Sequence, residues 1–365
     1  MSDNPNKRKA DGSKDLILVQ NESSENKKSK NELSIVKNTN QNRELIIGTE
    51  RTSKLKSPII QLSGHKGEIF TCKFNHSGTA LASGSYDKEI FLWNIFHEDC
   101  INYGVLKGHK GSVLELHWTT DDSEMVSVSS DKSIGVWDLN QGVLLKRIRE
   151  HKTFVNSCSV VRRGPPYLVS ASDDCSSRLF DQRTRGSIQI YKHQYPVTAV
   201  TFSDASDQVI TGSIDNIIRC WDLRQEEEPL MTLTGHQDSI TGLSVSNQNG
   251  GSYLLSNSMD QTIRQWDLRP YAPQNRCVKV YQGSQHNHEK NLIKCSWSPD
   301  DSRIASGSSD KLVYIWDTDT KKLLYRLPGH TGSINEVVFH PTEPIIASCS
   351  ADKTIFLGEI KYSDI

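Results

Sequence analysis

The sequence predicts an all-β protein, a seven-bladed β-propeller preceded by a disordered N-terminal tail. Three observations support this fold class. A unit of roughly forty residues recurs along the chain, which is typical of propeller blades. Within each unit, apolar and polar residues alternate in short runs bounded by Gly, Asp, Asn and Pro, and helical periodicity is absent. We expect the tail at residues 1–56 and the propeller at residues 57–361.

The tail consists mainly of Asn, Ser, Lys and Glu, and it cannot bury enough apolar surface to offset the entropy that ordering would cost. It holds 12 Lys/Arg against 8 Asp/Glu, a net charge of +4. Its clusters Lys7–Lys9 and Lys27–Lys30 suit either a nuclear import signal or a solvated basic segment. Because the net charge of the whole chain is −1, residues 57–365 carry a net charge of about −5. This negative charge argues against direct binding of nucleic acid by the propeller.

Bulk features exclude several other classes of protein. No apolar run approaches the length of a membrane span, and no secretory signal segment is found. The 8 cysteines are scattered without a C-x-x-C pair, which favours a reducing intracellular compartment. Histidine and cysteine spacings indicate no metal site, and no glycine-rich phosphate loop occurs, so we expect no cofactor and no small-molecule substrate.

Each repeat opens with a histidine, usually after glycine, and closes with a Trp-Asp pair or its substitute. The histidines are His65, His109, His151, His193, His236, His288 and His330. The closing aromatic residues are Trp93, Trp137, Phe180, Trp221, Trp266 and Trp316, with Gly358 in the last repeat. Seven openings and seven closings predict seven blades.

An aspartate precedes each closing residue by six positions, and hydroxyl residues stand two and four positions before each aspartate. The aspartates are Asp87, Asp131, Asp174, Asp215, Asp260, Asp310 and Asp352. In the second repeat, His109, Ser129 and Asp131 have the residue types of a nucleophilic triad, but catalysis needs only one copy. Copies in every repeat indicate a structural network, in which the histidine bonds the aspartate and a strand hydroxyl that also reaches the indole N–H. We expect weaker networks where Phe180 and Gly358 replace tryptophan.

The ring must join its two ends. The apolar segment Pro58–Leu62 precedes the first repeat without a sheet of its own, and the last repeat lacks an outer strand. We therefore expect Pro58–Leu62 to complete the seventh blade.

The recurring Gly-His and Trp-Asp pairs resemble those of WD-repeat proteins. In that family, the third and fifth residues after the histidine and the residue before the aspartate face the channel mouth. This resemblance implies a protein-binding surface that includes Glu68, Phe70, Tyr86, Phe154, Asn156, Asp173, Ile214, Met259, Asn291 and Asn335. The long interval Leu268–His288 is a second candidate contact or a neutral loop extension.

Longer segments, such as "HEKNLIKCSWSPD" and "LPGHTGSINEVVFHPTEPIIASCSADKTIFLGEI", resemble the WD-repeat subunits of the U5 small nuclear ribonucleoprotein of the spliceosome. The resemblance implies a nuclear, non-enzymatic scaffold for pre-mRNA splicing. Its expected partners are the large U5 scaffold protein and other spliceosomal proteins, with U5 RNA reached only indirectly and no membrane involved.

The sequence is also compatible with two alternatives. The segments Trp221–Arg224, Trp266–Arg269 and Phe180–Arg183 resemble motifs of WD-repeat substrate receptors of cullin-RING ubiquitin ligases, although such an arginine can also cap a turn by bonding carbonyls. The channel mouth is also compatible with a histone-tail reader.

Overall fold

The computed structural model describes residues 35–36, 45–46, 52–97, 100, 102–225, 227–248, 250–273, 275–287 and 291–360. The chain divides into two units, Met1–Arg51 and Thr52–Ile365. In the first unit, β1 (Ile35–Val36) pairs antiparallel with β2 (Leu45–Ile46). The rest of this unit, including both lysine clusters, lies outside the described residues. The disorder that we expect in the tail therefore stays a prediction.

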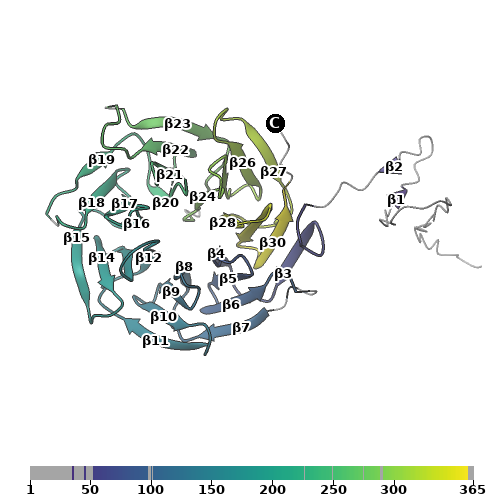
Figure 1. The fold of residues 1–365 in the computed structure, drawn as a ribbon, viewed down its shortest axis with the longest axis horizontal. Coiled ribbons are helices and arrows are strands. Elements are labelled where there is room, and N and C mark those ends of the chain that lie inside the picture. The colour runs from purple at the N-terminus through teal and green to yellow at the C-terminus, as the bar shows by residue number, and fades with distance from the viewer. Residues whose placement is uncertain are drawn as a thin grey trace, which may run out of the picture. The chain divides into compact units, whose positions relative to one another are not determined.

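Seven four-stranded antiparallel sheets form the second unit, arranged as blades around a central axis (Figure 1), which confirms the predicted propeller. Blade one consists of β4 (Ile69–Phe74), β5 (Ala80–Ser85), β6 (Glu89–Asn94) and β7 (Asn102–Lys107). Blade two consists of β8 (Val113–Trp118), β9 (Glu124–Ser129), β10 (Ile134–Asp138) and β11 (Val143–Ile148). Blade three consists of β12 (Val155–Val160), β13 (Tyr167–Ser172), β14 (Ser176–Asp181) and β15 (Ser187–Lys192). Blades four and five are β16 (Val197–Phe202), β17 (Gln208–Ser213), β18 (Ile218–Asp222), β19 (Met231–Leu233); and β20 (Ile240–Val245), β21 (Tyr253–Ser258), β22 (Thr262–Asp267), β23 (Cys277–Gln282). Blades six and seven are β24 (Cys295–Trp297), β25 (Arg303–Ser306), β26 (Val313–Asp317), β27 (Leu323–Leu327); and β28 (Ile334–Phe339), β29 (Ile345–Ser350), β30 (Thr354–Glu359), β3 (Ile59–Ser63).

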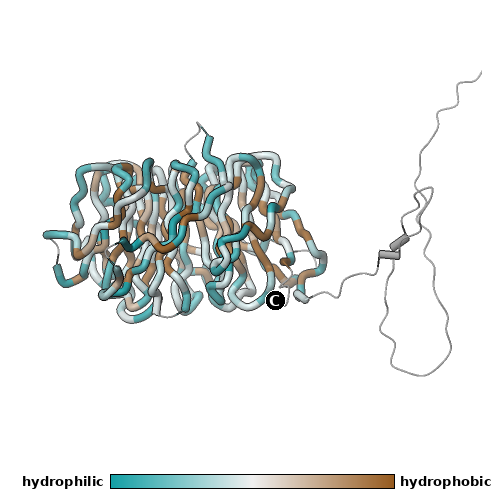
Figure 2. Tube along the Cα trace, turned by 90° about the horizontal axis from the view of Figure 1, so that it is seen from above, coloured by the Kyte–Doolittle hydropathy of each residue, from teal (hydrophilic) through white to brown (hydrophobic). Residues whose placement is uncertain are grey.

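The core lies between neighbouring blades. One apolar cluster joins Ala82 and Leu92 of blade one to Leu116 and Trp137 of blade two. Because each inner strand is covered on both faces, β5 and β29 are buried along their whole length, whereas the outermost strands alternate between buried and exposed side chains. Figure 2 shows the apolar residues along the strands, between two polar layers of loops.

The ring closes through the two ends of the propeller unit. β3 pairs with β30, with Ile59 opposite Gly358 and Ser63 opposite Thr354, so the predicted completion of blade seven is confirmed. None of the eight cysteines forms a disulfide, and among the described residues no helix is long and apolar enough to cross a membrane.

The segment Thr52–Lys56, which we expected to be part of the tail, belongs to the propeller unit. The backbone N–H and hydroxyl of Thr52 donate to Glu359 Oε1 over 2.7 and 2.8 Å, and the Ser53 N–H donates to the same oxygen over 3.0 Å. Lys54 pairs with Glu343 at 2.9 Å, and Leu55 is buried in the core. Glu359 stands where most repeats have the aspartate of the Trp-Asp pair. Its hydrogen bonds to Thr52 and Ser53 form a second connection between the two ends of the propeller unit.

Replacing Glu359 with alanine is expected to lower the free energy of unfolding by about 1–2 kcal/mol, because three donors lose their shared charged acceptor in a partly exposed site. Trypsin should also cut faster after Lys54 and Lys56. Urea unfolding and limited proteolysis measure both effects. Asp319→Ala, at a carboxylate whose side chain is 96% exposed, serves as the control. Equal cleavage rates in the two variants would contradict this role of Glu359.

Candidate functional site

The repeated His, Asp and hydroxyl residues form a network in the loops at one end of the channel. In blade one, His65 Nδ1 lies 2.8 Å from Asp87 Oδ2, and His65 Nε2 lies 2.8 Å from Ser83 Oγ. The indole N–H of Trp93 donates to the same hydroxyl over 2.9 Å. Blade two repeats these contacts with His109, Asp131 and Trp137, and blade five with His236, Asp260 and Trp266.

The hydroxyl in blade two is Ser127, whereas the sequence led us to place Ser129 in the network. Ser127 Oγ lies 2.7 Å from His109 Nε2, while Ser129 Oγ accepts the backbone N–H of Asp131 over 3.1 Å. Gly135 lies directly opposite Ser127 in the sheet. A Cβ at Gly135 would lie 2.9 Å from Trp137 Nε1 and 3.1 Å from His109 Nε2, so the absent side chain leaves room for both rings. In other blades the bonded hydroxyl lies opposite Phe91, Arg178 or Arg264, so this glycine is a feature of blade two and no general signal for the hydroxyl.

Blades three and seven keep most of the network without an indole. His151 bonds Asp174 at 2.9 Å and Ser170 at 2.7 Å. His330 bonds Asp352 and Ser348, both at 2.9 Å, and packs edge-on against Phe356. Because Phe180 and Gly358 stand where other blades have tryptophan, these two blades lack the hydrogen bond that the indole N–H donates elsewhere, as we expected.

Blade four departs from the prediction, because both ring nitrogens of His193 are buried without a hydrogen-bond partner. Asp215 instead accepts the Arg219 guanidinium at 2.6 Å, since a permanent cation competes better for the carboxylate than a neutral imidazole. Trp221 still donates to Thr211 over 3.0 Å. His193 is therefore a packing residue against Trp221.

Blade six also differs. His288 lies outside the described residues, and Asp310 Oδ2 accepts the Tyr314 hydroxyl at 2.5 Å. Trp316 donates to the backbone carbonyl of Gln282 over 3.2 Å instead of to a strand hydroxyl. Gly283 has a positive φ of 133°, as the glycines before His65, His236 and His330 also have positive φ, and the buried Ser284 follows it where those blades have the histidine.

Burial lowers the pKa of His193 to about 4, helped by Arg219 and opposed by Asp215. The unfolded chain therefore binds more protons between about pH 4 and 6.5, and stability falls as the pH drops through this window. His193→Phe is expected to change stability at pH 7 by less than about 1 kcal/mol and to flatten this loss, because the two unpaired nitrogens disappear. Unfolding followed at a series of pH values measures the slope.

His236→Phe is the matched control, since it removes the bonds to Asp260 and Ser256 and is expected to cost about 2–4 kcal/mol at pH 7. Burial also lowers the pKa of His65, His236, His286 and His330, so the wild-type slope is shared among several groups. An unchanged slope in His193→Phe would contradict the assignment.

The channel mouth is built from paired backbone positions. The N–H of the residue before the aspartate donates to the carbonyl of the third residue after the histidine, as Tyr86 does to Glu68 over 2.8 Å and Asp173 does to Phe154 over 3.1 Å. Tyr86, Phe154 and Ile214 are 61%, 51% and 42% exposed. Glu68 is exposed as well, while Phe70, Asp173, Met259 and Asn291 are half-buried. Tyr195, 51% exposed, was missed because it occupies none of the three positions carried over from the family.

Two residues that we placed on the mouth surface are buried and tie blades together. Asn156 donates to the Val197 carbonyl of blade four over 3.1 Å, and Asn335 donates to the Ile69 carbonyl of blade one over 2.7 Å. With exposed fractions of 7% and 2%, they have no surface to offer a partner.

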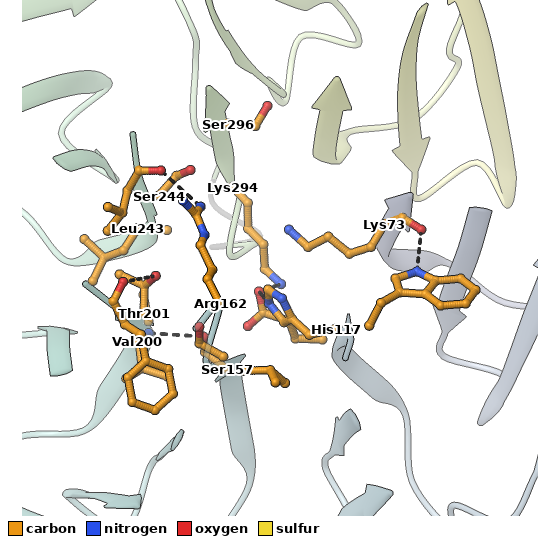
Figure 3. A pocket seen from close by; sticks show the side chains of 18 of the residues that line it. Lys73, His117, Ser157, Arg162, Val200, Thr201, Leu243, Ser244, Lys294 and Ser296 are labelled. Atoms are coloured by element: carbon orange, nitrogen blue, oxygen red, sulfur yellow. Dashed lines mark hydrogen bonds and ion pairs between the residues drawn. The ribbon is translucent and has the colours of Figure 1, made fainter. Parts of the chain in front are cut away.

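Toward its opposite end, the channel contains a cavity of about 600 Å³, lined by residues of the innermost strands of all seven blades and of the loops that follow these strands (Figure 3). Lys73 Nζ lies 2.5 Å from Glu336, which joins blades one and seven, and Lys294 Nζ lies 2.8 Å from Glu115, which joins blades six and two. Burial opposes the charge on both carboxylates, but the two ammonium groups hold the pKa of Glu115 and Glu336 below the usual range. This cluster was not predicted from the sequence, although its members recur six or eight positions after the histidines.

Among the described residues, Glu115, His117 and Cys158 form a trio whose ligand atoms lie within 4.8 Å of one another. Glu115 already pairs with Lys294 and accepts the Cys158 backbone N–H over 3.0 Å. Burial raises the pKa of the Cys158 thiol well above its usual value, so the thiolate that a metal would need is disfavoured.

The arginines after the closing pairs bond carboxylates instead of the carbonyls that a turn cap would use. The guanidinium of Arg183 donates to Asp181, and that of Arg269 donates to Asp267, each two residues earlier. Arg224 follows the third such pair, and its backbone N–H donates to Asp222.

The family described as "WD domain, G-beta repeat" matches the chain at residues 56–94, 101–138, 142–181, 186–222, 227–267, 275–317 and 321–357. The U5 small nuclear ribonucleoprotein 40 kDa protein of Dictyostelium discoideum is 63% identical over 98% of this chain and 99% of its own length. The human protein of the same name is 57% identical over 86% of this chain and 87% of its own. Pre-mRNA-splicing factor cwf17 of Schizosaccharomyces pombe is 42% identical over 85% and 90%.

Proposed function

Since this chain belongs to the WD40 family, and within it to the 40 kDa proteins of the U5 small nuclear ribonucleoprotein, we propose that it is a protein–protein interaction scaffold of that particle in pre-mRNA splicing. The observation that carries the proposal is the similarity to the Dictyostelium protein along 99% of that protein's length, which includes all seven blades. The name of the fission-yeast relative, pre-mRNA-splicing factor cwf17, also states a role in splicing. By the same reasoning we place the protein in the nucleus, within the spliceosome.

We further propose that the chain has no catalytic activity of its own. Supporting this, Ser127 is fully buried, and the side chain of its neighbour His109 has no exposed surface. Burial would raise the pKa of Asp131, but hydrogen bonds from His109 and Ser133 hold it well below the usual range. A nucleophile that already bonds an imidazole and an indole behind the loop surface has no access to a substrate.

The channel mouth is the docking surface in this proposal. Large exposed apolar side chains on a rigid loop frame suit a protein partner, and Tyr86, Phe154 and Ile214 meet this description. We propose the large U5 scaffold protein as the direct partner, with U5 RNA reached through the particle. No observation favours the ubiquitin-ligase or histone-reader alternatives.

Affinity purification of the tagged full chain from nuclear extract, followed by mass spectrometry and RNA sequencing, tests this function. We expect U5 RNA and spliceosomal proteins to be enriched. The double variant Tyr86→Ala/Phe154→Ala should lose its direct protein partner without a change in unfolding. Tyr271→Ala, at a fully exposed aromatic residue in a loop of the opposite face, is the control. Recovery of a cullin adaptor without U5 RNA would refute the proposal.

A further inference from the structure

Seven exposed lysines lie beside the channel mouth on five of its seven blades, and we call them the lysine arc. Three directly follow the histidine of their blade, namely Lys66, Lys110 and Lys152. Four directly follow the aspartate, namely Lys88, Lys132, Lys311 and Lys353. They belong to blades six, seven, one, two and three, which are consecutive in the ring. At the same positions, blades four and five carry the neutral residues Gln194, Asn216, Gln237 and Gln261.

The hydrogen-bonded network holds the backbone of the lysine arc in place. The N–H groups of Lys66, Lys110 and Lys152 donate to the aspartates of their blades over 3.0, 2.8 and 3.0 Å. Lys88 and Lys132 adopt left-handed turn conformations with φ of 72° and 67°. The ammonium groups are therefore presented from fixed loops, which reduces the entropy lost on binding.

Charge is segregated on this face, although the chain as a whole is nearly neutral. In the described part of these loops, the exposed carboxylates are Glu68 and Asp238, because the network aspartates are partly buried and bonded. The arc thus forms a cationic border around the exposed aromatic side chains Tyr86 and Phe154. A partner of this surface needs apolar side chains at the centre and negative charge at the edge.

We propose that the segment docking at this mouth is an acidic protein segment with one or two large apolar residues, and this inference rests on the proposed function. The apolar residues pack on Tyr86 and Phe154, and the carboxylates on either side face the lysine arc. Complementary charge of this kind speeds association and selects among partners.

A single-stranded RNA fits the same surface less well. Tyr86 and Phe154 each share a backbone hydrogen bond with an acidic residue, Tyr86 with Glu68 and Phe154 with Asp173. A nucleotide stacked on either ring would bring its own phosphate close to that carboxylate, since every nucleotide carries one. A peptide can instead place an apolar or basic residue there and keep its acidic residues for the arc.

A display library of random 16-residue peptides, selected on the immobilised full chain, tests the proposal. We expect the enriched peptides to be richer in Asp and Glu than the starting library and to contain an aromatic or aliphatic residue. Fluorescence anisotropy then measures the affinity of the most enriched peptide. Lys66→Gln/Lys88→Gln/Lys110→Gln/Lys132→Gln should weaken it by about tenfold or more, as should raising the salt concentration. Lys321→Gln/Lys322→Gln, at exposed lysines between β26 and β27 on the opposite face, is the matched control and should bind normally.

Other outcomes separate the two proposals. Enriched peptides without acidic residues that still lose binding in Tyr86→Ala/Phe154→Ala would overturn the inference about the lysine arc and leave the docking function standing. Tighter binding of a 12-nucleotide oligouridylate than of any selected peptide would also overturn it, in favour of nucleic acid. If no selected peptide depends on the mouth residues, the docking surface itself is wrong. Equal urea unfolding of all variants ensures that each loss reflects binding.

Discussion

Replacing Glu336 with alanine is expected to lower the free energy of unfolding by about 3–5 kcal/mol, because it leaves Lys73 without its ion-pair partner in the channel. The carboxylate of Glu336 also accepts the Thr71 hydroxyl over 2.7 Å and the Cys72 N–H over 2.9 Å. Its side chain is 1% exposed, so these bonds are made away from bulk water. Urea unfolding followed by intrinsic tryptophan fluorescence measures the loss.

Two further variants locate the cause of this effect. Lys73→Met combined with Glu336→Met removes both charges and should recover much of the lost stability, since a buried ion pair replaced by apolar groups is often neutral. Lys107→Ala breaks an ion pair with Glu89 in which the lysine side chain is 69% exposed, and it should cost less than about 1 kcal/mol. A loss from Glu336→Ala no greater than that from Lys107→Ala would show that the channel pair adds nothing.

Replacing Ser127 with alanine is expected to cost about 2–5 kcal/mol, because two buried ring nitrogens, on His109 and Trp137, lose their common partner at once. The measurement is again urea unfolding at pH 7. Ser129→Ala removes only an acceptor for one backbone N–H and should cost about 0.5–1.5 kcal/mol. If Ser129→Ala is the more damaging of the two, the hydroxyl in the network is misassigned.

The sequence predicts the blade number and the ring closure because both follow from periodicity. A blade cannot bury its two faces alone, so each repeat must carry the same apolar pattern, and the unpaired segment Pro58–Leu62 must find the one incomplete sheet. The exposed mouth residues Tyr86, Phe154 and Ile214 were also found from their position in the repeat.

Choices between neighbouring atoms were harder to predict. Ser127 and Ser129 lie on the same face of one strand, and only the folded geometry, which brings Ser127 within reach of both His109 and Trp137, decides between them. The spacing of residues in the sequence also does not show that the Arg219 guanidinium donates to Asp215, which leaves the ring nitrogens of His193 without a hydrogen-bond partner. The Lys294–Glu115 pair crosses the channel between blades two and six, and a local pattern contains no information about such a partner.

The double closure of the ring has a consequence for how the protein is made. Thr52 and Glu359, which meet in the folded state, stand 307 residues apart in the chain. During translation, the first outer strand emerges long before the edge that receives it, and it stays available for wrong pairing until the last blade has left the ribosome. Contacts of such high sequence separation form late and slowly. β3 is therefore the strand that the topology leaves unpaired for longest in the nascent chain.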